Sequence, residues 1–142
     1  FKFNYILWAI TKKNPSKKDP DLNLKTRIKL SKKILKNIKK IKVEYLDDHV
    51  KSSSTFDLLN FLKNFNKKLE IYFLIGADNL INFHKWHNWK KIPKIAKIVI
   101  FDRYPYLTKA LDSIALKRLE KKDWIFIKFK KVNISSSKIK KI

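Results

Sequence analysis

The apolar positions along the chain predict five strands that alternate with helices. Nearly continuous apolar runs, typical of buried strands, occur at Tyr5–Ile10, Leu69–Ile75, Ile95–Phe101 and Trp124–Phe129. A further short strand is expected at Ile41–Tyr45. Apolar residues recur at helical spacing in Leu22–Ile38, in the segment that follows the capping residues Ser52–Thr55, and in Thr108–Leu119. Shorter helical pieces are expected at Ile81–Trp89 and at Ser137–Ile142. This alternation favours an α/β fold with a parallel sheet flanked by helices.

Ligands of such sheets bind beyond the carboxyl ends of the strands. The segments that follow predicted strands and carry polar or aromatic side chains are Thr11–Lys18, Gly76–Trp89, Asp102–Tyr106 and Val132–Lys140. The sequence therefore predicts that a ligand site is built from these segments.

Composition narrows the class of protein. The length of 142 residues fits one domain, and the absence of cysteine excludes disulfides, thiolate metal sites and cysteine nucleophiles. No apolar run reaches the roughly 18 residues that a membrane span requires. The chain begins with Phe1 and contains no methionine, which we interpret as the mark of a segment excised from a longer product. We expect residues 1–142 to be a single domain of a cytoplasmic protein.

The formal net charge of +23 raises a basic nucleic-acid-binding module as an alternative function. Arginine, whose planar fork suits phosphates and bases, occurs only at Arg27, Arg103 and Arg118, and every other basic residue is lysine. Lysine, isoleucine, asparagine and phenylalanine are abundant and glycine occurs once, a composition typical of AT-rich codons. Lysines spread over solvent-exposed faces therefore explain the net charge better than a nucleic-acid-binding surface does. Nucleic acid is not an expected partner.

The only glycine, Gly76, follows the third predicted strand. Either a positive φ angle or the close approach of a ligand would require glycine there, and a plain turn at the end of the strand is the simpler alternative. Asp78 lies two residues later, where it could bind a ribose hydroxyl or a metal-bound phosphate, or merely cap a helix.

Aromatic residues follow this glycine. Trp86 and Trp89 flank His87, and such rings can enclose a heterocyclic base, although packing in the core is an equal alternative. His84 and His87 are three residues apart, but no third ligand is evident, so no metal site is predicted.

Three further positions suit phosphate groups. Arg103 follows the fourth predicted strand, and Lys17 lies in the first loop. Ser135–Ser137 precede a predicted helix, where hydroxyl and backbone N–H groups can bind an anion, with Lys138 and Lys140 adding charge. A helix cap explains the serines equally well.

In combination, these features resemble bacterial nicotinate-nucleotide adenylyltransferases. The segment Phe73–Ile92, FLIGADNLINFHKWHNWKKI, is similar to the family's G-[AQ]-D, F-x-x-W and second aromatic. Four more segments resemble family motifs in the right order: Trp8–Lys18, Ser53–Asp57, Ile98–Tyr106 and Ile134–Lys140. The tryptophans argue against a sibling family such as the pantetheine-phosphate adenylyltransferases.

The resemblance implies a Rossmann-like nucleotidyltransferase fold and transfer of the adenylyl group of ATP, assisted by Mg²⁺, to nicotinate mononucleotide. It implies that Trp86 stacks on the pyridine ring. The mononucleotide contacts it implies are Thr55, Gly76, Asp78, Trp86, His87 and Arg103. The ATP contacts it implies are Lys17, Ser135, Ser136 and Lys140.

The chain also departs from the family pattern. The motif G-G-x-F-D-P-x-H-x-G-H, with the two catalytic histidines, does not occur in the 142 residues, and the resemblance implies that it precedes Phe1 together with the first strand. We therefore expect the fragment, which would also lack the family's C-terminal end, to have no catalytic residue of its own and little activity. Lys140 stands where the family has arginine, and it cannot make the same bidentate contact with a phosphate. The sequence predicts neither the oligomeric state nor the preference between acid and amide mononucleotides.

Overall fold

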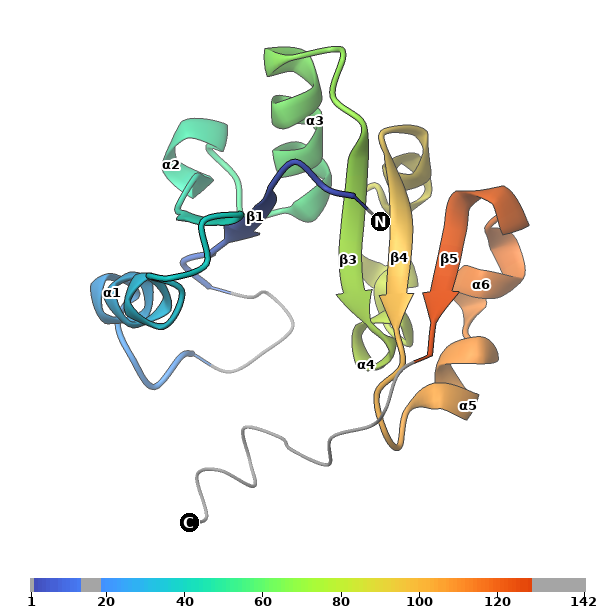
Figure 1. The fold of residues 1–142 in the computed structure, drawn as a ribbon. Helices are drawn as coiled ribbons and strands as arrows, with labels where there is room; N and C mark the ends of the chain where they lie inside the picture. Colours follow the sequence, from blue (N-terminus) through green and yellow to red (C-terminus); the bar gives the residue numbers. More distant parts are fainter. Residues whose placement is uncertain (1, 14–18, 129–142) are drawn as a thin grey trace. The chain divides into compact units, whose positions relative to one another are not determined.

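The computed structural model describes residues 2–13 and 19–128 (Figure 1). Its contacts divide the chain into two compact units, Phe1–Phe61 and Leu62–Ile142. The predicted loop at Val132–Ser137 and the helix predicted at Ser137–Ile142 lie outside the described residues.

The first unit contains two parallel strands joined by a helix. Strands β1 (Ile6–Ala9) and β2 (Ile41–Glu44) pair with Ile6 opposite Ile41 and Ala9 opposite Glu44. Helix α1 (Leu24–Ile34) connects them, and the short helix α2 (Asp47–Val50) follows β2. Helix α3 (Thr55–Phe65) begins in this unit. The two strands and both longer helices were predicted from the apolar pattern, whereas α2 was not.

Local side-chain contacts explain where α1 begins. The side chain of Asn23, one of two predicted capping residues, accepts a hydrogen bond from the backbone N–H of Thr26 at 2.9 Å. Lys32 and Lys33 occupy the last turn, where the helix dipole favours positive charge. The helix ends at Ile34, four residues before the predicted end.

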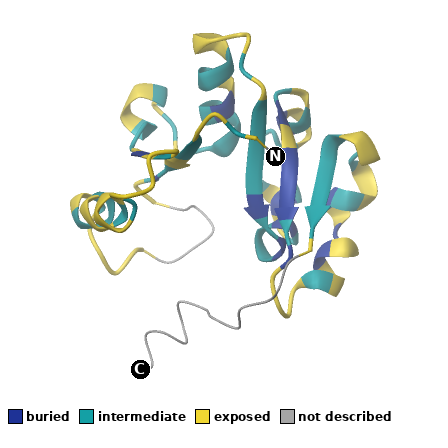
Figure 2. Ribbon diagram, viewed as in Figure 1, coloured by how far each residue is buried: buried dark blue, intermediate teal, exposed yellow. Residues whose placement is uncertain are grey.

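The second unit is a three-stranded parallel sheet with β4 (Ala96–Phe101) between β3 (Ile71–Gly76) and β5 (Trp124–Ile127). In β4, Ile98, Val99 and Ile100 are completely buried, and Figure 2 shows the burial concentrated on this strand. Burial of successive residues means that both faces of β4 are covered, which explains its nearly continuous apolar sequence. Parallel strands flanked by helices confirm the predicted fold class.

Short helices connect the three strands. Between β3 and β4 lie α4 (Ala77–Leu80) and two 3₁₀ helices, η1 (Phe83–Lys85) and η2 (Trp89–Lys94). Between β4 and β5 lie α5 (Leu107–Leu111), α6 (Ile114–Arg118) and the 3₁₀ helix η3 (Lys121–Asp123).

The single helix predicted at Thr108–Leu119 is wrong, because Ser113 divides it. Ser113 is buried in an extended conformation (φ −66°, ψ 147°), and its hydroxyl accepts a hydrogen bond from the N–H of Leu116 at 3.3 Å. A serine that caps a new helix in this way interrupts the preceding one.

Candidate functional site

The carboxyl ends of the strands in the second unit bring two predicted segments together. The register pairs Gly76 with Phe101, and Phe101 with Ile127. Because parallel strands end at the same edge, the residues after β3 lie beside those after β4. This confirms the expected neighbourhood of the Gly76–Trp89 and Asp102–Tyr106 segments.

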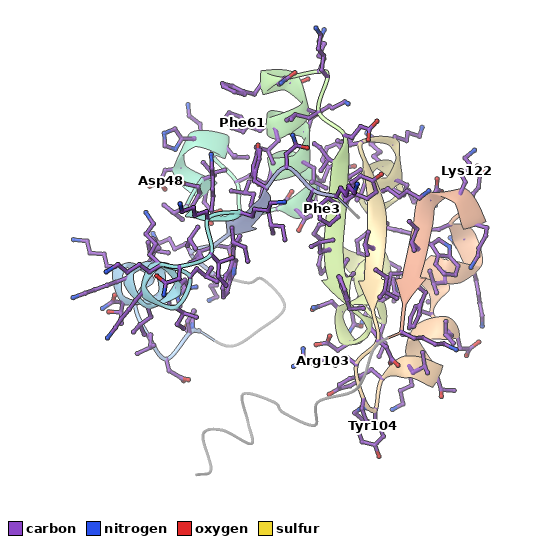
Figure 3. All side chains as sticks on the ribbon, viewed as in Figure 1. Phe3, Asp48, Phe61, Arg103, Tyr104 and Lys122 are labelled. Atoms are coloured by element: carbon purple, nitrogen blue, oxygen red, sulfur yellow. The ribbon has the colours of Figure 1, made fainter. Side chains whose placement is uncertain are left out.

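Asp78 and Arg103 form an ion pair at this edge. Arg103 Nη1 donates a hydrogen bond to Asp78 Oδ2 at 2.9 Å. The Arg103 side chain is 45% exposed and that of Asp78 is 19% exposed. Figure 3 shows Arg103 at the carboxyl ends of β3 and β4. A half-exposed guanidinium fixed by a carboxylate is suited to binding an anionic group.

Gly76 does not have the positive φ angle that was considered. It is the N-cap residue of α4, with φ −79° and ψ 151°, a conformation that any residue adopts. The space around it is restrictive instead, since a Cβ atom would lie 2.5 Å from Asp78 Oδ1. A side chain at position 76 would therefore require the end of the Asp78 side chain to shift.

Asp78 is not the helix cap that was considered as its alternative role, because Gly76 occupies that position. Its second oxygen, Oδ1, is buried and has no hydrogen-bond partner among the described residues. A buried carboxylate oxygen without a partner is unfavourable by about 1–3 kcal/mol.

Aromatic rings pack against one another behind this edge. The centroid of Phe83, which is completely buried, lies 5.2 Å from that of Trp86 and 6.1 Å from that of Trp89. Trp86 also meets the ring of Phe73 edge-on at 6.1 Å. Trp86 is extended (φ −76°, ψ 149°) after η1, so the two tryptophans do not share one helix. Trp86 is only half-buried, so it both packs in the core and presents surface.

The two neighbouring histidines differ in their surroundings. His87 is exposed, and its Nε2 lies 2.8 Å from the side-chain nitrogen of Asn88. His84 Nδ1 is buried without a hydrogen-bond partner among the described residues. Within the ranges 2–13 and 19–128, no group of three or more His, Cys, Asp or Glu residues could hold a metal ion.

In the first unit, Thr55 begins α3 next to a serine–aspartate network. Asp57 Oδ2 accepts hydrogen bonds from the hydroxyls of Ser52 at 2.6 Å and Ser54 at 2.8 Å. Ser54 Oγ in turn accepts from the backbone N–H of Asp57 at 3.1 Å. This reciprocal cap fixes the chain immediately before Thr55.

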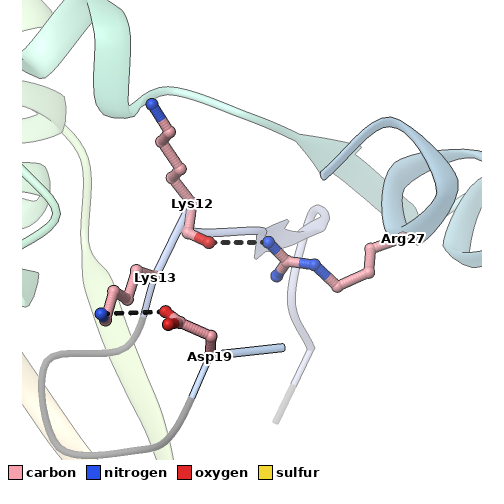
Figure 4. A network of polar contacts seen from close by, with 4 residues as sticks. All are labelled: Lys12, Lys13, Asp19 and Arg27. Atoms are coloured by element: carbon pink, nitrogen blue, oxygen red, sulfur yellow. Dashed lines mark hydrogen bonds and ion pairs between the residues drawn. The ribbon is translucent and has the colours of Figure 1, made fainter. Parts of the chain in front are cut away.

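The loop after β1 is fixed by Arg27, a residue that sequence reasoning did not assign to the site. Its Nη1 donates to the carbonyl oxygen of Thr11 at 2.9 Å. Its Nη2 donates to the carbonyl oxygen of Lys12 at 2.8 Å (Figure 4). The N–H of Lys12 donates to Asp47 Oδ2 at 2.8 Å. The scarcity of arginine was the one signal in the sequence that pointed to Arg27.

An open cavity of about 500 Å³ lies beside this loop. It is lined by Lys12, Lys13, Asp19, Tyr45, Asp47, Asp48, Ser52 and Ser53. A hydrogen bond from the Tyr45 hydroxyl to Asp48, at 2.8 Å, raises the pKa of Tyr45 above its ordinary value, and desolvation and the Asp48 charge act in the same direction.

The predicted contact residues are thus distributed as follows. Thr55 belongs to the first unit, and the other mononucleotide contacts belong to the second. The predicted ATP contacts Lys17, Ser135, Ser136 and Lys140 lie outside the described residues. Among the residues that the structure describes, every helix is too short or too polar to span a lipid bilayer.

Comparison with known proteins identifies the family. A model of the cytidylyltransferase-like family matches residues 1–142. A probable nicotinate-nucleotide adenylyltransferase of Pelagibacter ubique is 51% identical over 137 residues, covering 96% of this chain and 76% of that protein. One of Aliarcobacter butzleri is 33% identical over 69% of this chain and 54% of that protein.

Solved structures agree in fold. Plasmodium falciparum nicotinic acid mononucleotide adenylyltransferase complexed with NaAD superposes with a TM-score of 0.75 at 22% sequence identity, covering 97% of this chain and 68% of that chain. The same enzyme complexed with APC gives a TM-score of 0.72. The fold is therefore the Rossmann-like nucleotidyltransferase fold, and the chain belongs to the nicotinate-nucleotide adenylyltransferase family.

Proposed function

We propose that the chain serves adenylyl transfer from ATP to nicotinate mononucleotide, which forms deamido-NAD and pyrophosphate in the cytoplasm. The observation that carries the proposal is the 51% identity, over 96% of the chain, to a probable nicotinate-nucleotide adenylyltransferase. The Asp78–Arg103 pair supports it, because a half-exposed cation at the carboxyl ends of parallel strands suits an anionic nucleotide.

In this reaction the 5′-phosphate of the mononucleotide attacks the α-phosphorus of ATP, a P–O bond forms, and pyrophosphate leaves. Such transfers depend on alignment and on neutralisation of charge more than on covalent help from the protein. We assign Arg103 to an anionic group of the mononucleotide and Trp86 to its pyridine ring. We also assign contacts with the mononucleotide to Thr55 of the first unit and to Gly76, Asp78 and His87 of the second.

We assign Lys17, Ser135, Ser136 and Lys140 to the ATP phosphates. Mg²⁺ is proposed as part of the ATP substrate, bound to the phosphate oxygens.

The transition state also needs the histidine motif that the family resemblance implies. We propose that residues 1–142 supply mononucleotide binding, and that the same residues preceded by a G-x-F-D-P-x-H-x-G-H segment catalyse the transfer. The 142-residue chain alone is then expected to have little or no activity.

The test measures both properties. Titration calorimetry with nicotinate mononucleotide measures binding to the 142-residue chain, and chromatographic detection of deamido-NAD measures activity with and without the added motif. Binding that Trp86→Ala weakens, and Trp8→Ala does not, supports the proposal. The absence of both binding and activity in the chain that carries the motif refutes it.

A further inference from the structure

The chain that leaves β1 is held at one residue by two side chains. Arg27 Nη2 donates a hydrogen bond to the carbonyl oxygen of Lys12 at 2.8 Å (Figure 4). The backbone N–H of Lys12 donates to Asp47 Oδ2 at 2.8 Å. Arg27 belongs to α1 and Asp47 is the first residue of α2, and both helices lie in the first unit with β1. Both backbone polar groups of Lys12 are therefore bonded to side chains of other elements.

Arg27 also bonds the residue before Lys12. Its Nη1 donates to the carbonyl oxygen of Thr11 at 2.9 Å in a partly buried position. In an extended strand, successive carbonyl groups point to opposite sides, so one guanidinium reaches both only where the chain bends. Lys12 lies at such a bend. The guanidinium thus selects one bent conformation of the chain directly after β1.

This contact needs arginine and not merely a positive charge. A guanidinium presents its donors in a planar fork, whereas the ammonium of lysine is a point charge on a flexible stem. The other basic residues of α1 are all exposed lysines, while Arg27 is half-buried. The one arginine of this helix therefore stands where the fork is used.

We propose that Arg27 is a positioning residue for a nucleotide phosphate, which acts by fixing Thr11 and Lys12, and that Asp47 acts on the same Lys12 backbone. Thr11 and Lys12 follow the carboxyl end of β1, and ligands of parallel sheets bind beyond such ends. A segment that is already ordered loses less conformational entropy when a ligand binds, so the anchor raises affinity without touching the ligand. This inference rests on the proposed function, which assigns the loop after β1 to a phosphate.

The first experiment measures the affinity of the 142-residue chain for ATP and for nicotinate mononucleotide by titration calorimetry. Arg27→Lys keeps the charge and loses the fork, and it should weaken the binding of at least one of the two ligands about three- to tenfold. Asp47→Ala should weaken the binding of the same ligand, and Asp47→Asn, which keeps an acceptor oxygen, should restore most of the affinity. The ligand affected shows which phosphate the loop serves.

The matched control is Arg118→Lys, the same substitution at an exposed arginine whose side chain makes no hydrogen bond or ion pair among the described residues. It should change neither affinity. The dependence on phosphate is tested with adenosine and nicotinate riboside, by ligand-observed nuclear magnetic resonance, which measures weak binding. Arg27→Lys should weaken the binding of the phosphorylated ligand more than that of its counterpart without phosphate. Equal losses for the two overturn the inference.

A double variant distinguishes one shared anchor from two independent effects. Because Arg27 and Asp47 both act through Lys12, the combination of Arg27→Lys with Asp47→Ala should weaken binding by less than the product of the two single losses. Losses that multiply overturn the inference, since they require that the two side chains act on the ligand separately.

A second experiment needs no ligand, so its outcome does not depend on the proposed function. In the unmodified chain, the bond to Asp47 should slow hydrogen exchange of the Lys12 amide about tenfold relative to an unstructured chain. Arg27→Lys and Asp47→Ala should remove most of this protection, and Asp47→Asn should keep it. The amide of Ile10, which donates to the carbonyl oxygen of Glu44 at 2.9 Å, should remain protected in every variant.

The two experiments fail in different ways. An unmodified chain that binds neither ATP nor nicotinate mononucleotide refutes the proposed function and, with it, the assignment of the anchor to a phosphate. A Lys12 amide whose exchange is indifferent to Arg27→Lys refutes the anchor itself, whatever the chain binds. Loss of protection at both Ile10 and Lys12, or loss at Lys12 with unchanged affinities, means that Arg27 serves only the stability of the first unit, and the positioning role is then wrong. Circular dichroism establishes that each variant is folded.

Discussion

Replacement of Phe83 by leucine tests whether the aromatic cluster behind the candidate site holds its tryptophans in place. Phe83 is completely buried, and its ring packs against Trp86 at 5.2 Å and Trp89 at 6.1 Å between centroids. Leucine retains most of the apolar volume and removes the aromatic contacts. The substitution therefore separates ring geometry from simple burial.

The expected loss follows from these two contacts. An aromatic pair contributes about 0.5–1.5 kcal/mol beyond burial, so two pairs predict a loss of about 1–3 kcal/mol for Phe83→Leu. Phe83→Ala also leaves a cavity and should cost about 3–5 kcal/mol. A unit of this size has a total stability of about 4–12 kcal/mol, which makes leucine the more informative change.

The assay is urea unfolding followed by tryptophan fluorescence in a Trp8→Phe background. The remaining tryptophans, Trp86, Trp89 and Trp124, all lie in the second unit. With a slope of about 1–3 kcal/mol/M, Phe83→Leu should lower the midpoint by about 1 M without changing the slope.

Phe65→Leu is the matched control, because Phe65 is 84% exposed and in the same unit. That substitution should change stability by less than about 0.5 kcal/mol. The reasoning fails if Phe83→Leu destabilises no more than Phe65→Leu. It also fails if the midpoint falls while the affinity for mononucleotide is unchanged, since the cluster would then not position Trp86.

Other parts of the chain give three further predictions. Ser54→Ala should lower the free energy of unfolding by about 1 kcal/mol, because the Ser54 hydroxyl caps α3 through Asp57. Ser53→Ala removes no hydrogen bond among the described residues and should leave the free energy of unfolding unchanged. Because the pKa of Tyr45 is raised, its hydrogen bond to Asp48 stabilises the fold at pH values below the ordinary tyrosine pKa of about 10. This stabilisation is lost as the pH rises through the raised pKa. Asp48→Ala should lower the pKa of Tyr45, which is measured by tyrosine absorbance with Tyr45→Phe as the reference. Binding to RNA or DNA should weaken steeply with salt and should not exceed that of a protein with matched lysine content; tighter, sequence-dependent binding would favour the nucleic-acid alternative.

Burial on both faces explains why the strands of the second unit could be predicted closely. Val99 and its neighbours in β4 are apolar without interruption, so no helical period competes with the strand assignment. The helix boundaries were less predictable because short polar contacts decide them. Ser113 ends one helix and caps the next through a single hydroxyl, and nothing in the apolar spacing of Thr108–Leu119 distinguishes that serine from one inside a helix.

The proximity of the segments after β3 and β4 was predictable from the sequence, and the contacts between their side chains were not. Gly76, Asp78 and Arg103 each follow a predicted strand, and the parallel arrangement is sufficient to bring the two segments together. The sequence offered a positive φ angle, a ligand or a plain turn as reasons for glycine. The structure excludes the positive φ angle and places the Asp78 carboxylate 2.5 Å from where a Cβ atom of residue 76 would lie. The position of the Asp78 carboxylate beside Gly76 depends on a side-chain rotamer that no periodicity encodes.

The two interpretations of Trp86, packing in the core and stacking on a base, do not exclude each other. Its ring contacts Phe73 on β3 and Phe83 on η1, which fixes its orientation from two sides. It remains half-buried, and its extended backbone follows the end of η1. A ring that is already ordered loses little entropy when a heterocycle stacks on its remaining surface. The packing of Trp86 therefore supports the proposed stacking of its ring on the pyridine ring of the mononucleotide.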